Sequence, residues 1–329
     1  MPRERKSTKK GAKLKKEAII LLNMGGPNNL NEVELFLKNM FSDPNILTMK
    51  SGLLRKFVGG MITFLRTESS QEIYRQLGGK SPIVDITKEI VKNLQDSLGE
   101  GVVVDFAMRY TPPFAGEVIE RLRDRDISKV YLIPMYPQYS TTTTKSSLED
   151  FEEAYHKSGM DAVLVEIKHY FENESYNRAI LARIQERMED EMYEDYDIIF
   201  SAHGLPQKIV DAGDVYQKHI EKHVAILKEM MKQAGMEFHD VHLAYQSKVG
   251  PMKWLEPSLQ EKLKTVRNRG VIIYPIAFTV DNSETDYELS IEYKEIADEL
   301  GFKNYKVCRC VNDHPLFIKT LQELYEKMR

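Results

Sequence analysis

The sequence is poor in cysteine and tryptophan. Its 329 residues include two cysteines, Cys308 and Cys310, and one tryptophan, Trp254. Two cysteines cannot build the disulfide framework of a small secreted domain. They lie two residues apart on a predicted strand, where their side chains point the same way without an easy bridge. The sequence therefore predicts a reducing compartment, and we expect a cytoplasmic protein.

Long hydrophobic runs and a strong net charge are also absent. No stretch approaches the roughly 20 apolar residues that a membrane-spanning helix needs. The net charge of -4 gives no general basic field, which makes nucleic acid a poor candidate for a partner. Residues 1–16 hold eight Lys or Arg and lack the apolar segment of a secretory signal. We expect a disordered basic tail there, with a transit peptide as the weaker alternative.

Short apolar runs alternate with longer amphipathic stretches along the chain. The predicted strands are 18–22, 102–107, 130–135, 162–167, 198–202, 241–245, 271–276 and 305–308. The predicted helices are 30–41, 115–125, 176–192, 215–236, 287–300 and 315–328. This alternation is typical of parallel sheets wrapped by helices. We predict an α/β fold of two similar Rossmann-like lobes, each a mostly parallel four-stranded sheet flanked by helices, with a cleft between them.

The predicted lobes divide the chain near residue 170. Residues 17–170 form the N-terminal lobe and residues 171–306 the C-terminal lobe, while residues 307–329 form a final strand and helix that return to the N-terminal lobe. Residues 44–81 are too long for a simple connection and are predicted as an insertion. The insertion is rich in Leu, Phe, Met and Ile, which predicts either a buried amphipathic helix or an apolar lip. Such a lip would grip a flat ligand or touch a bilayer surface.

His203 stands directly after a predicted strand, in the run Ser-Ala-His-Gly-Leu-Pro. A lone histidine at such a place is often structural. Glu284, however, follows another strand of the same lobe, and both loops leave the sheet edge where ligands bind in open α/β folds. An imidazole nitrogen and a carboxylate oxygen suit a borderline divalent metal but are too few to trap it permanently. The pair therefore predicts a transiently held metal.

Three glutamates, Glu284, Glu288 and Glu292, repeat every four residues and share one face of a predicted helix. Like charges at this spacing destabilise a helix by about 0.2–0.5 kcal/mol per pair. One reading is a solvated face neutralised by nearby lysines. The other is a path for metal ions or protons that leads away from His203.

The residues around the predicted cleft limit the kind of ligand. The glycines of Gly25-Gly26 and Gly78-Gly79 fit neither the dinucleotide nor the P-loop spacing, which argues against a nucleotide. Four cations are candidate partners for ligand carboxylates or members of surface ion pairs: Arg66, Lys80, Arg109 and Lys145. Aromatic residues beside the same loops suit a flat conjugated ligand or pack in the core: Tyr110, Tyr136, Tyr139, Trp254 and Phe278.

Seven ordered stretches of the chain resemble the ferrochelatase family, and the resemblance runs from about residue 18 to the end. They are residues 22–27, 76–83, 108–110, 136–140, 201–203, 245–252 and 275–279. The resemblance implies a lyase that inserts Fe²⁺ into protoporphyrin IX to give protohaem, the last step of haem biosynthesis, in a porphyrin cleft between the lobes. The Asn-Met-Gly-Gly-Pro loop at residues 23–27 is similar to that of enzymes using protoporphyrin IX and unlike the Tyr-Gly-Thr-Pro loop of the coproporphyrin branch.

The resemblance also implies roles for individual residues. His203 and Glu284 match the metal-binding histidine and glutamate of the family and are expected to bind Fe²⁺ and accept pyrrole protons. Glu288 and Glu292 match the proton or metal relay. The predicted porphyrin contacts, from this match and from the cations and aromatic residues above, are Met24, Arg66, Tyr74, Ser81, Arg109, Tyr110, Tyr139 and Phe278.

The chain departs from the family pattern at Asn282, where many relatives have a histidine. This substitution removes a side chain that could carry an auxiliary proton. No permanently bound cofactor is expected, and two cysteines cannot supply the four thiolates of the [2Fe-2S] cluster that some relatives carry. Two other functions stay open: a noncatalytic porphyrin or haem carrier, and a chelatase of the same fold for another tetrapyrrole and metal. The oligomeric state is open, with a monomer slightly favoured, and the apolar lip suggests peripheral membrane contact.

Overall fold

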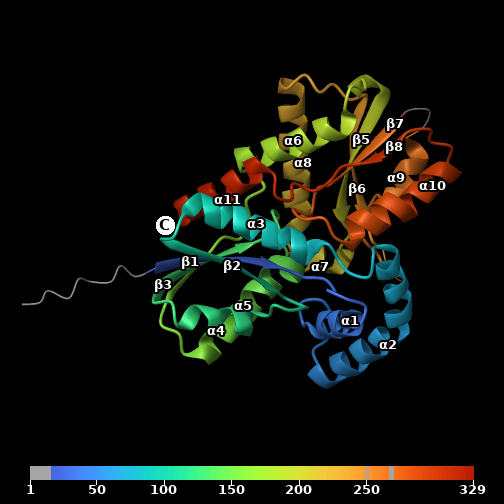
Figure 1. The fold of residues 1–329 in the computed structure, drawn as a ribbon. Helices are drawn as coiled ribbons and strands as arrows, with labels where there is room; N and C mark the ends of the chain where they lie inside the picture. The colour runs from blue at the N-terminus through green and yellow to red at the C-terminus, as the bar shows by residue number, and fades with distance from the viewer. Residues whose placement is uncertain (1–15, 249, 251, 267–269) are drawn as a thin grey trace, which may run out of the picture.

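The computed structural model describes residues 16–248, 250, 252–266 and 270–329, which form two four-stranded sheets (Figure 1). The first sheet, ordered β2–β1–β3–β4, consists of β1 (Lys16–Asn23), β2 (Val102–Met108), β3 (Ile127–Pro134) and β4 (Val163–Glu166). The second, ordered β6–β5–β7–β8, consists of β5 (Tyr196–His203), β6 (Asp240–Gln246), β7 (Gly270–Pro275) and β8 (Tyr305–Val307). All neighbouring strands are parallel, and the two sheets repeat one order. The predicted fold class is confirmed.

Helices cover both faces of each sheet. Those up to residue 158 are α1 (Glu32–Ser42), α2 (Gly52–Gln76), α3 (Ile83–Leu98), α4 (Ala115–Arg123), the π-helical turn η1 (Thr141–Lys145) and α5 (Ser146–Ser158). Those after it are α6 (Glu174–Met188), the 3₁₀ turn η2 (Tyr193–Asp195), α7 (Gln207–Asp211), α8 (Tyr216–Gln233), α9 (Leu259–Thr265), the π-helix η3 (Glu284–Glu292), α10 (Tyr293–Glu299) and α11 (Pro315–Met328). The sequence analysis did not assign α3, although Ile83, Ile90 and Leu94 form a buried stripe at helical spacing.

The two lobes share one continuous core. Alternate residues of β1 serve opposite faces of the first sheet: Ile20 packs in the core with α4 and α5, whereas Ile19 packs in the core that also contains Ile198 and Phe200 of β5. Helices α3, α6, α8 and α11 contribute side chains to that shared core. Side chains from both sheets therefore pack into one core, which joins the two lobes.

The end of the chain differs in one respect from the prediction. The last strand, β8, ends at Val307 and pairs with β7, so it belongs to the second sheet and does not return to the N-terminal lobe. Only the helix returns: α11 packs against α3 and α6 over the first sheet (Figure 1). At the other end, Lys16 is already part of β1, while the rest of the predicted basic tail, residues 1–15, lies outside the described residues.

The insertion contains the single 25-residue helix α2, which we call the lip helix. It crosses close to α1 at Gly59, where an added Cβ would lie 2.7 Å from the carbonyl oxygen of Phe41. Its outer face is apolar and exposed: Leu53 is 84 % exposed, Phe57 71 % and Phe64 83 %. The lip helix is therefore not the buried amphipathic helix that was one of the two sequence readings. Within the described residues, no helix has the length and hydropathy to cross a bilayer.

Candidate active site

His203 is the last residue of β5 and directs its imidazole toward the start of η3. Its Nδ1 lies 2.7 Å from Oε2 of Glu284, which confirms that the two side chains meet at one edge of the second sheet. The Tyr216 hydroxyl donates to the His203 carbonyl oxygen at 2.9 Å. The next residue is Gly204. A side chain does not fit at this position, since a Cβ would lie 2.8 Å from the carbonyl oxygen of Gln246. These contacts fix the strand end that carries His203.

Glu284 begins the π-helix η3, where a regular α-helix was predicted from residue 287. The N–H of Tyr293 donates to the carbonyl oxygen of Glu288, and the Ser290 hydroxyl donates to that of Thr285, both across five residues. The Asn282 side chain accepts the N–H of Glu284 at 2.8 Å, so in this chain it organises the turn. Wide helical turns of this kind are rare and occur frequently at functional sites.

Glu288 lies beside Glu284 and shares its hydrogen-bond donors. The Ser247 N–H donates to Glu288 Oε1 at 2.8 Å and its hydroxyl to Oε2 at 2.6 Å. The same hydroxyl lies 3.2 Å from Glu284, and the Gln246 amide lies 3.4 Å from both carboxylates. Ser247 has φ of 66°, an uncommon conformation for a residue with a side chain. With this backbone conformation, the Ser247 N–H donates to Glu288.

His203, Glu284 and Glu288 shift one another's pKa values. Burial alone would lower the pKa of His203, but the carboxylate of Glu284 raises it. Burial would raise the pKa of Glu284, yet His203 and the donors Ser247 and Gln246 lower it. Burial and the charge of Glu284 raise the pKa of Glu288 to about 7. Burial and Glu295 raise the pKa of Glu292. The site thus holds groups that exchange protons near neutral pH.

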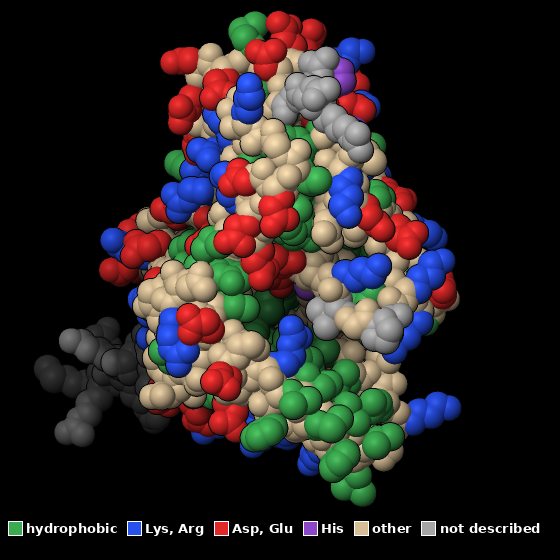
Figure 2. Space-filling model, turned by 90° about the vertical axis from the view of Figure 1, so that its right-hand side faces the viewer, with side chains coloured by type: hydrophobic (Ala, Val, Ile, Leu, Met, Phe, Trp, Pro, Cys, Tyr) green, Lys and Arg blue, Asp and Glu red, His purple; other side chains and the backbone are tan. Residues whose placement is uncertain are grey.

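The site is open to a ligand. The His203 side chain is 38 % exposed and that of Glu284 is 22 % exposed. Figure 2 shows a hollow on this face of the molecule, with acidic side chains along one side and the apolar surface of the lip helix below it. A flat ligand in the hollow would meet apolar side chains as well as the carboxylate row.

Two of the predicted porphyrin contacts, Tyr74 and Phe278, lie beside the His203–Glu284 pair. The Tyr74 hydroxyl lies 3.3 Å from the hydroxyl of Ser283, next to Glu284, and burial raises the pKa of Tyr74 to about 12. The Phe278 ring meets the His203 ring edge to face at 6.5 Å between centroids. Ser81 is buried beside Gly26, in the loop that follows Met24. Arg66 is exposed on the lip helix, and the backbone N–H of half-buried Tyr139 donates to His219.

Other candidates from the sequence are occupied by protein partners. Lys80 pairs with Asp85 at 2.5 Å, and Lys145 with Glu149 at 3.5 Å. Arg109 binds Asp150 at 3.0 Å and lies 3.4 Å from Asp43, beside a cavity of about 510 Å³. The Tyr110 hydroxyl donates to Asp43 at 2.8 Å and is buried. These ion pairs and hydrogen bonds disfavour Arg109 and Tyr110 as direct ligands of a porphyrin.

Sequence reasoning missed the roles of Gln246 and Ser247. Both lie in one of the stretches that carry the family resemblance, but nothing in the residue types shows that Ser247 adopts a positive φ. The pairing of β5 with β6 places Gln246 opposite His203. The sequence analysis predicted both strands but not their register, so this neighbour of His203 was not identified.

Comparison with known proteins identifies the family. Residues 16–329 match the family profile described as Ferrochelatase. The chain is 65 % identical over 316 residues to the ferrochelatase of Sulfurimonas denitrificans, covering 96 % of this chain and all of that one. It is 47 % identical over 319 residues to the ferrochelatase of Helicobacter pylori strain G27, covering 97 % of this chain and 95 % of that one.

Solved structures share the fold. The structure described as SirB from Bacillus subtilis with Fe³⁺ superimposes with a TM-score of 0.55 at 12 % identity, covering 94 % of this chain and 95 % of that one. This likeness shows a common two-sheet chelatase architecture. The match along the whole described sequence and the identity to the named relatives establish more than that: the chain belongs to the ferrochelatase family, lyases of haem biosynthesis.

Proposed function

We propose that this chain inserts Fe²⁺ into protoporphyrin IX, with His203 and Glu284 as metal ligands and proton acceptors. The observation that carries the proposal is the 2.7 Å contact between His203 Nδ1 and Glu284 Oε2, two side chains that are both partly exposed. One nitrogen and one carboxylate oxygen hold a divalent ion without enclosing it. Fe²⁺ is a substrate here, and catalysis needs no permanently bound cofactor.

Metallation exchanges two pyrrole N–H protons for one Fe²⁺, so the site must receive protons as well as deliver the ion. The Glu284 carboxylate stays ionised and attracts Fe²⁺, since its neighbours lower its pKa. His203 accepts the two pyrrole protons one after the other, at the ring face that the metal approaches, and releases the first before it takes the second. Glu288, with a pKa of about 7, accepts each proton from His203, and Glu292 passes it toward solvent. No redox change occurs, because iron enters and leaves the reaction as Fe²⁺.

The residues of the site favour this proposal over the two rival functions. A carrier would keep the porphyrin hollow without needing a histidine, two glutamates and their donors Gln246 and Ser247. A chelatase for another tetrapyrrole would prefer a different macrocycle or ion. The residue 23–27 loop, similar to that of protoporphyrin enzymes, favours protoporphyrin IX.

Anaerobic turnover tests the proposal. Purified protein with excess Fe²⁺ and protoporphyrin IX should lose free-porphyrin fluorescence over many turnovers per site. Parallel reactions contain coproporphyrin III or sirohydrochlorin, or Co²⁺ in place of Fe²⁺. Quenching that stops at one porphyrin per chain would identify a carrier, and faster reaction with another macrocycle would identify a different chelatase.

Arg66→Ala should weaken porphyrin binding while sparing chemistry. Arg66 lies exposed on the lip helix, where its guanidinium can pair with a propionate. Loss of a charged hydrogen bond costs about 1.5–3 kcal/mol, roughly a tenfold to hundredfold increase in KM for porphyrin. Arg75→Ala, on the same helix but paired with Glu72, is the matched control. Equal effects of both substitutions would remove Arg66 from the binding site.

We also propose that the lip helix makes this cytoplasmic protein a peripheral membrane protein and that the chain acts as a monomer. The lip helix also carries the exposed cations Lys56 and Arg66 and has no acidic residue between Gly52 and Thr67. Such a surface suits the interface of an anionic bilayer. Each apolar side chain that leaves water would contribute up to about 1.5–3 kcal/mol.

The double variant Phe57→Ser/Phe64→Ser should therefore lose most binding to vesicles that contain anionic lipid. Co-sedimentation with vesicles measures the bound fraction. Val163→Ser removes an apolar side chain that is 58 % exposed on β4 and serves as the control. Unchanged vesicle binding would contradict the membrane proposal. A concentration-dependent dimer that the double variant abolishes would show that the lip helix covers a second copy instead.

A further inference from the structure

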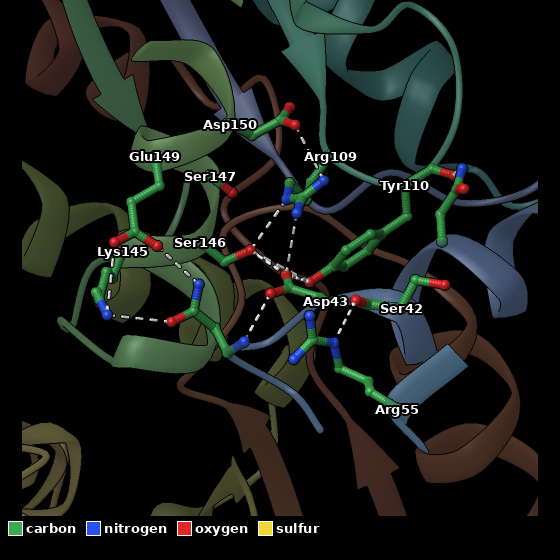
Figure 3. A network of polar contacts seen from close by, with 12 residues as sticks. Ser42, Asp43, Arg55, Arg109, Tyr110, Lys145, Ser146, Ser147, Glu149 and Asp150 are labelled. Atoms are coloured by element: carbon green, nitrogen blue, oxygen red, sulfur yellow. Dashed lines mark hydrogen bonds and ion pairs between the residues drawn. The ribbon is translucent and has the colours of Figure 1, made fainter. Parts of the chain in front are cut away.

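The base of the lip helix is anchored by a buried network centred on Arg109 (Figure 3). Asp43 follows α1 directly and precedes the turn into the lip helix, and its side chain is fully buried. Its carboxylate accepts from the Tyr110 hydroxyl at 2.8 Å, from the Ser146 hydroxyl and from the N–H of Asn45. The Arg109 guanidinium, 3.4 Å away, supplies the positive charge that a buried carboxylate requires.

Arg109 connects Asp43 to α5. Its Nε donates to the Ser146 hydroxyl at 3.0 Å and its Nη1 to Asp150 at 3.0 Å, so three edges of one guanidinium are occupied. The guanidinium is planar and rigid, which fixes the relative positions of its partners. Asn45 adds a second link, since its amide donates to Glu149 at 2.8 Å and accepts from Lys145.

The same network reaches the loop that contains Met24 through the backbone. The N–H of Arg109 donates to the carbonyl oxygen of Asn23 at 2.8 Å, and the N–H of Tyr110 donates to that of Met24 at 3.0 Å. On the other side, Arg55 of the lip helix donates to the carbonyl oxygens of Ser42 and Met49, which flank the turn. Displacement of Arg109 would therefore move both the Met24 loop and the base of the lip helix.

We propose that Arg109 is a positioning residue: through Asp43 and Asp150 it fixes the lip helix and the Met24 loop at the separation that porphyrin binding requires. This inference rests on the proposed function for the identity of the ligand. It replaces the sequence-based reading in which Arg109 holds a porphyrin carboxylate. Arg109 then acts on affinity without touching the macrocycle.

Asp150→Asn distinguishes the two roles because they predict opposite signs. Asp150 is the less buried of the two carboxylates, with a side chain 29 % exposed, so the variant is expected to fold. If Arg109 is an anchor, the substitution loosens the lip base and raises the Kd for protoporphyrin by about tenfold, the effect of losing one charged hydrogen bond. If Arg109 instead binds a propionate, removal of its acidic competitor lowers the Kd.

Porphyrin binding is measured by fluorescence without iron, so the result stands even if wild-type protein shows no turnover. The KM of Arg109→Lys for porphyrin should lie between the values of the wild type and of Asp150→Asn, and its kcat should be nearly unchanged. The control is Asp105→Asn, which removes the carboxylate partner of Arg121, an arginine outside the Arg109 network. This variant should leave the Kd unchanged. Protoporphyrin dimethyl ester, which lacks carboxylates, should lose affinity for Asp150→Asn as much as the free acid does.

Three results would overturn the proposal. They are a lower or unchanged Kd in Asp150→Asn, an effect confined to the free acid, and a loss of kcat and thermal stability in step without a change in Kd. Amide hydrogen exchange supplies the direct readout, since exchange should rise at residues 43–51 in Asp150→Asn and not in Asp105→Asn.

Discussion

His203→Ala should abolish iron insertion while porphyrin binding survives. The substitution removes one of the two protein ligands for Fe²⁺ and the base closest to the metal. Loss of a general base alone costs about 10²–10⁴ in rate, and loss of a metal ligand adds to it. The porphyrin contacts proposed for Arg66, Tyr74 and Ser81 stay in place. We therefore expect kcat to fall by at least about 10³-fold and the porphyrin Kd to change little.

The second sheet contains a matched control for this experiment. His239 Nδ1 lies 2.8 Å from Asp197 Oδ1, almost the same geometry as His203 with Glu284, but at the amino end of β5. His239→Ala should leave kcat and KM unchanged. Anaerobic turnover measures kcat, and porphyrin fluorescence measures Kd. Normal turnover in His203→Ala would remove His203 from the mechanism, and a large loss of porphyrin affinity would make it a binding residue.

The meeting of His203 and Glu284 could be predicted because it depends on topology. Each follows a segment with the apolar pattern of a buried parallel strand, and parallel strands of one sheet bring their carboxyl ends to one edge. The strand pattern also predicted the eight strands of the two sheets. These features follow from hydrophobic periodicity, which is local in sequence.

The parts that could not be predicted depend on side-chain competition and on backbone conformations. Lys80 and Arg109 were candidates for binding ligand carboxylates, but each binds a carboxylate of the protein instead. The partner of Lys80 lies 5 residues away in the sequence, and that of Arg109 lies 41 residues away. Residue types alone cannot show whether a cation binds a carboxylate of the protein or one of a ligand. The π-helix at Glu284 and the positive φ of Ser247 belong to segments that meet only in the fold, through the hydrogen bond from the Ser247 N–H to Glu288. The exposed face of the lip helix consists of the same apolar residue types as the buried face of a core helix, so its exposure could not be predicted from composition.

Glu284→Gln should reduce kcat by about 10²-fold or more, because it removes the negative charge that attracts Fe²⁺ while preserving shape. The amide still accepts a hydrogen bond, so the variant should fold with the strand end at His203 intact. Glu299→Gln, an exposed change at the end of α10, is the control for a loss of one negative charge on the same lobe. A wild-type kcat in Glu284→Gln would show that His203 and Glu288 suffice.

The pH dependence of Glu284→Gln gives an independent check. In wild type, Glu284 raises the pKa of His203 above its usual 6.5, so activity that requires the neutral imidazole is lost as pH falls through that raised value. Without the carboxylate, burial lowers the pKa of His203, and the neutral form persists to lower pH. The acid limb of the kcat/KM profile should therefore move to lower pH in the variant. A limb that stays in place would show that neither His203 nor Glu288 sets it, because the charge of Glu284 raises the pKa of both groups.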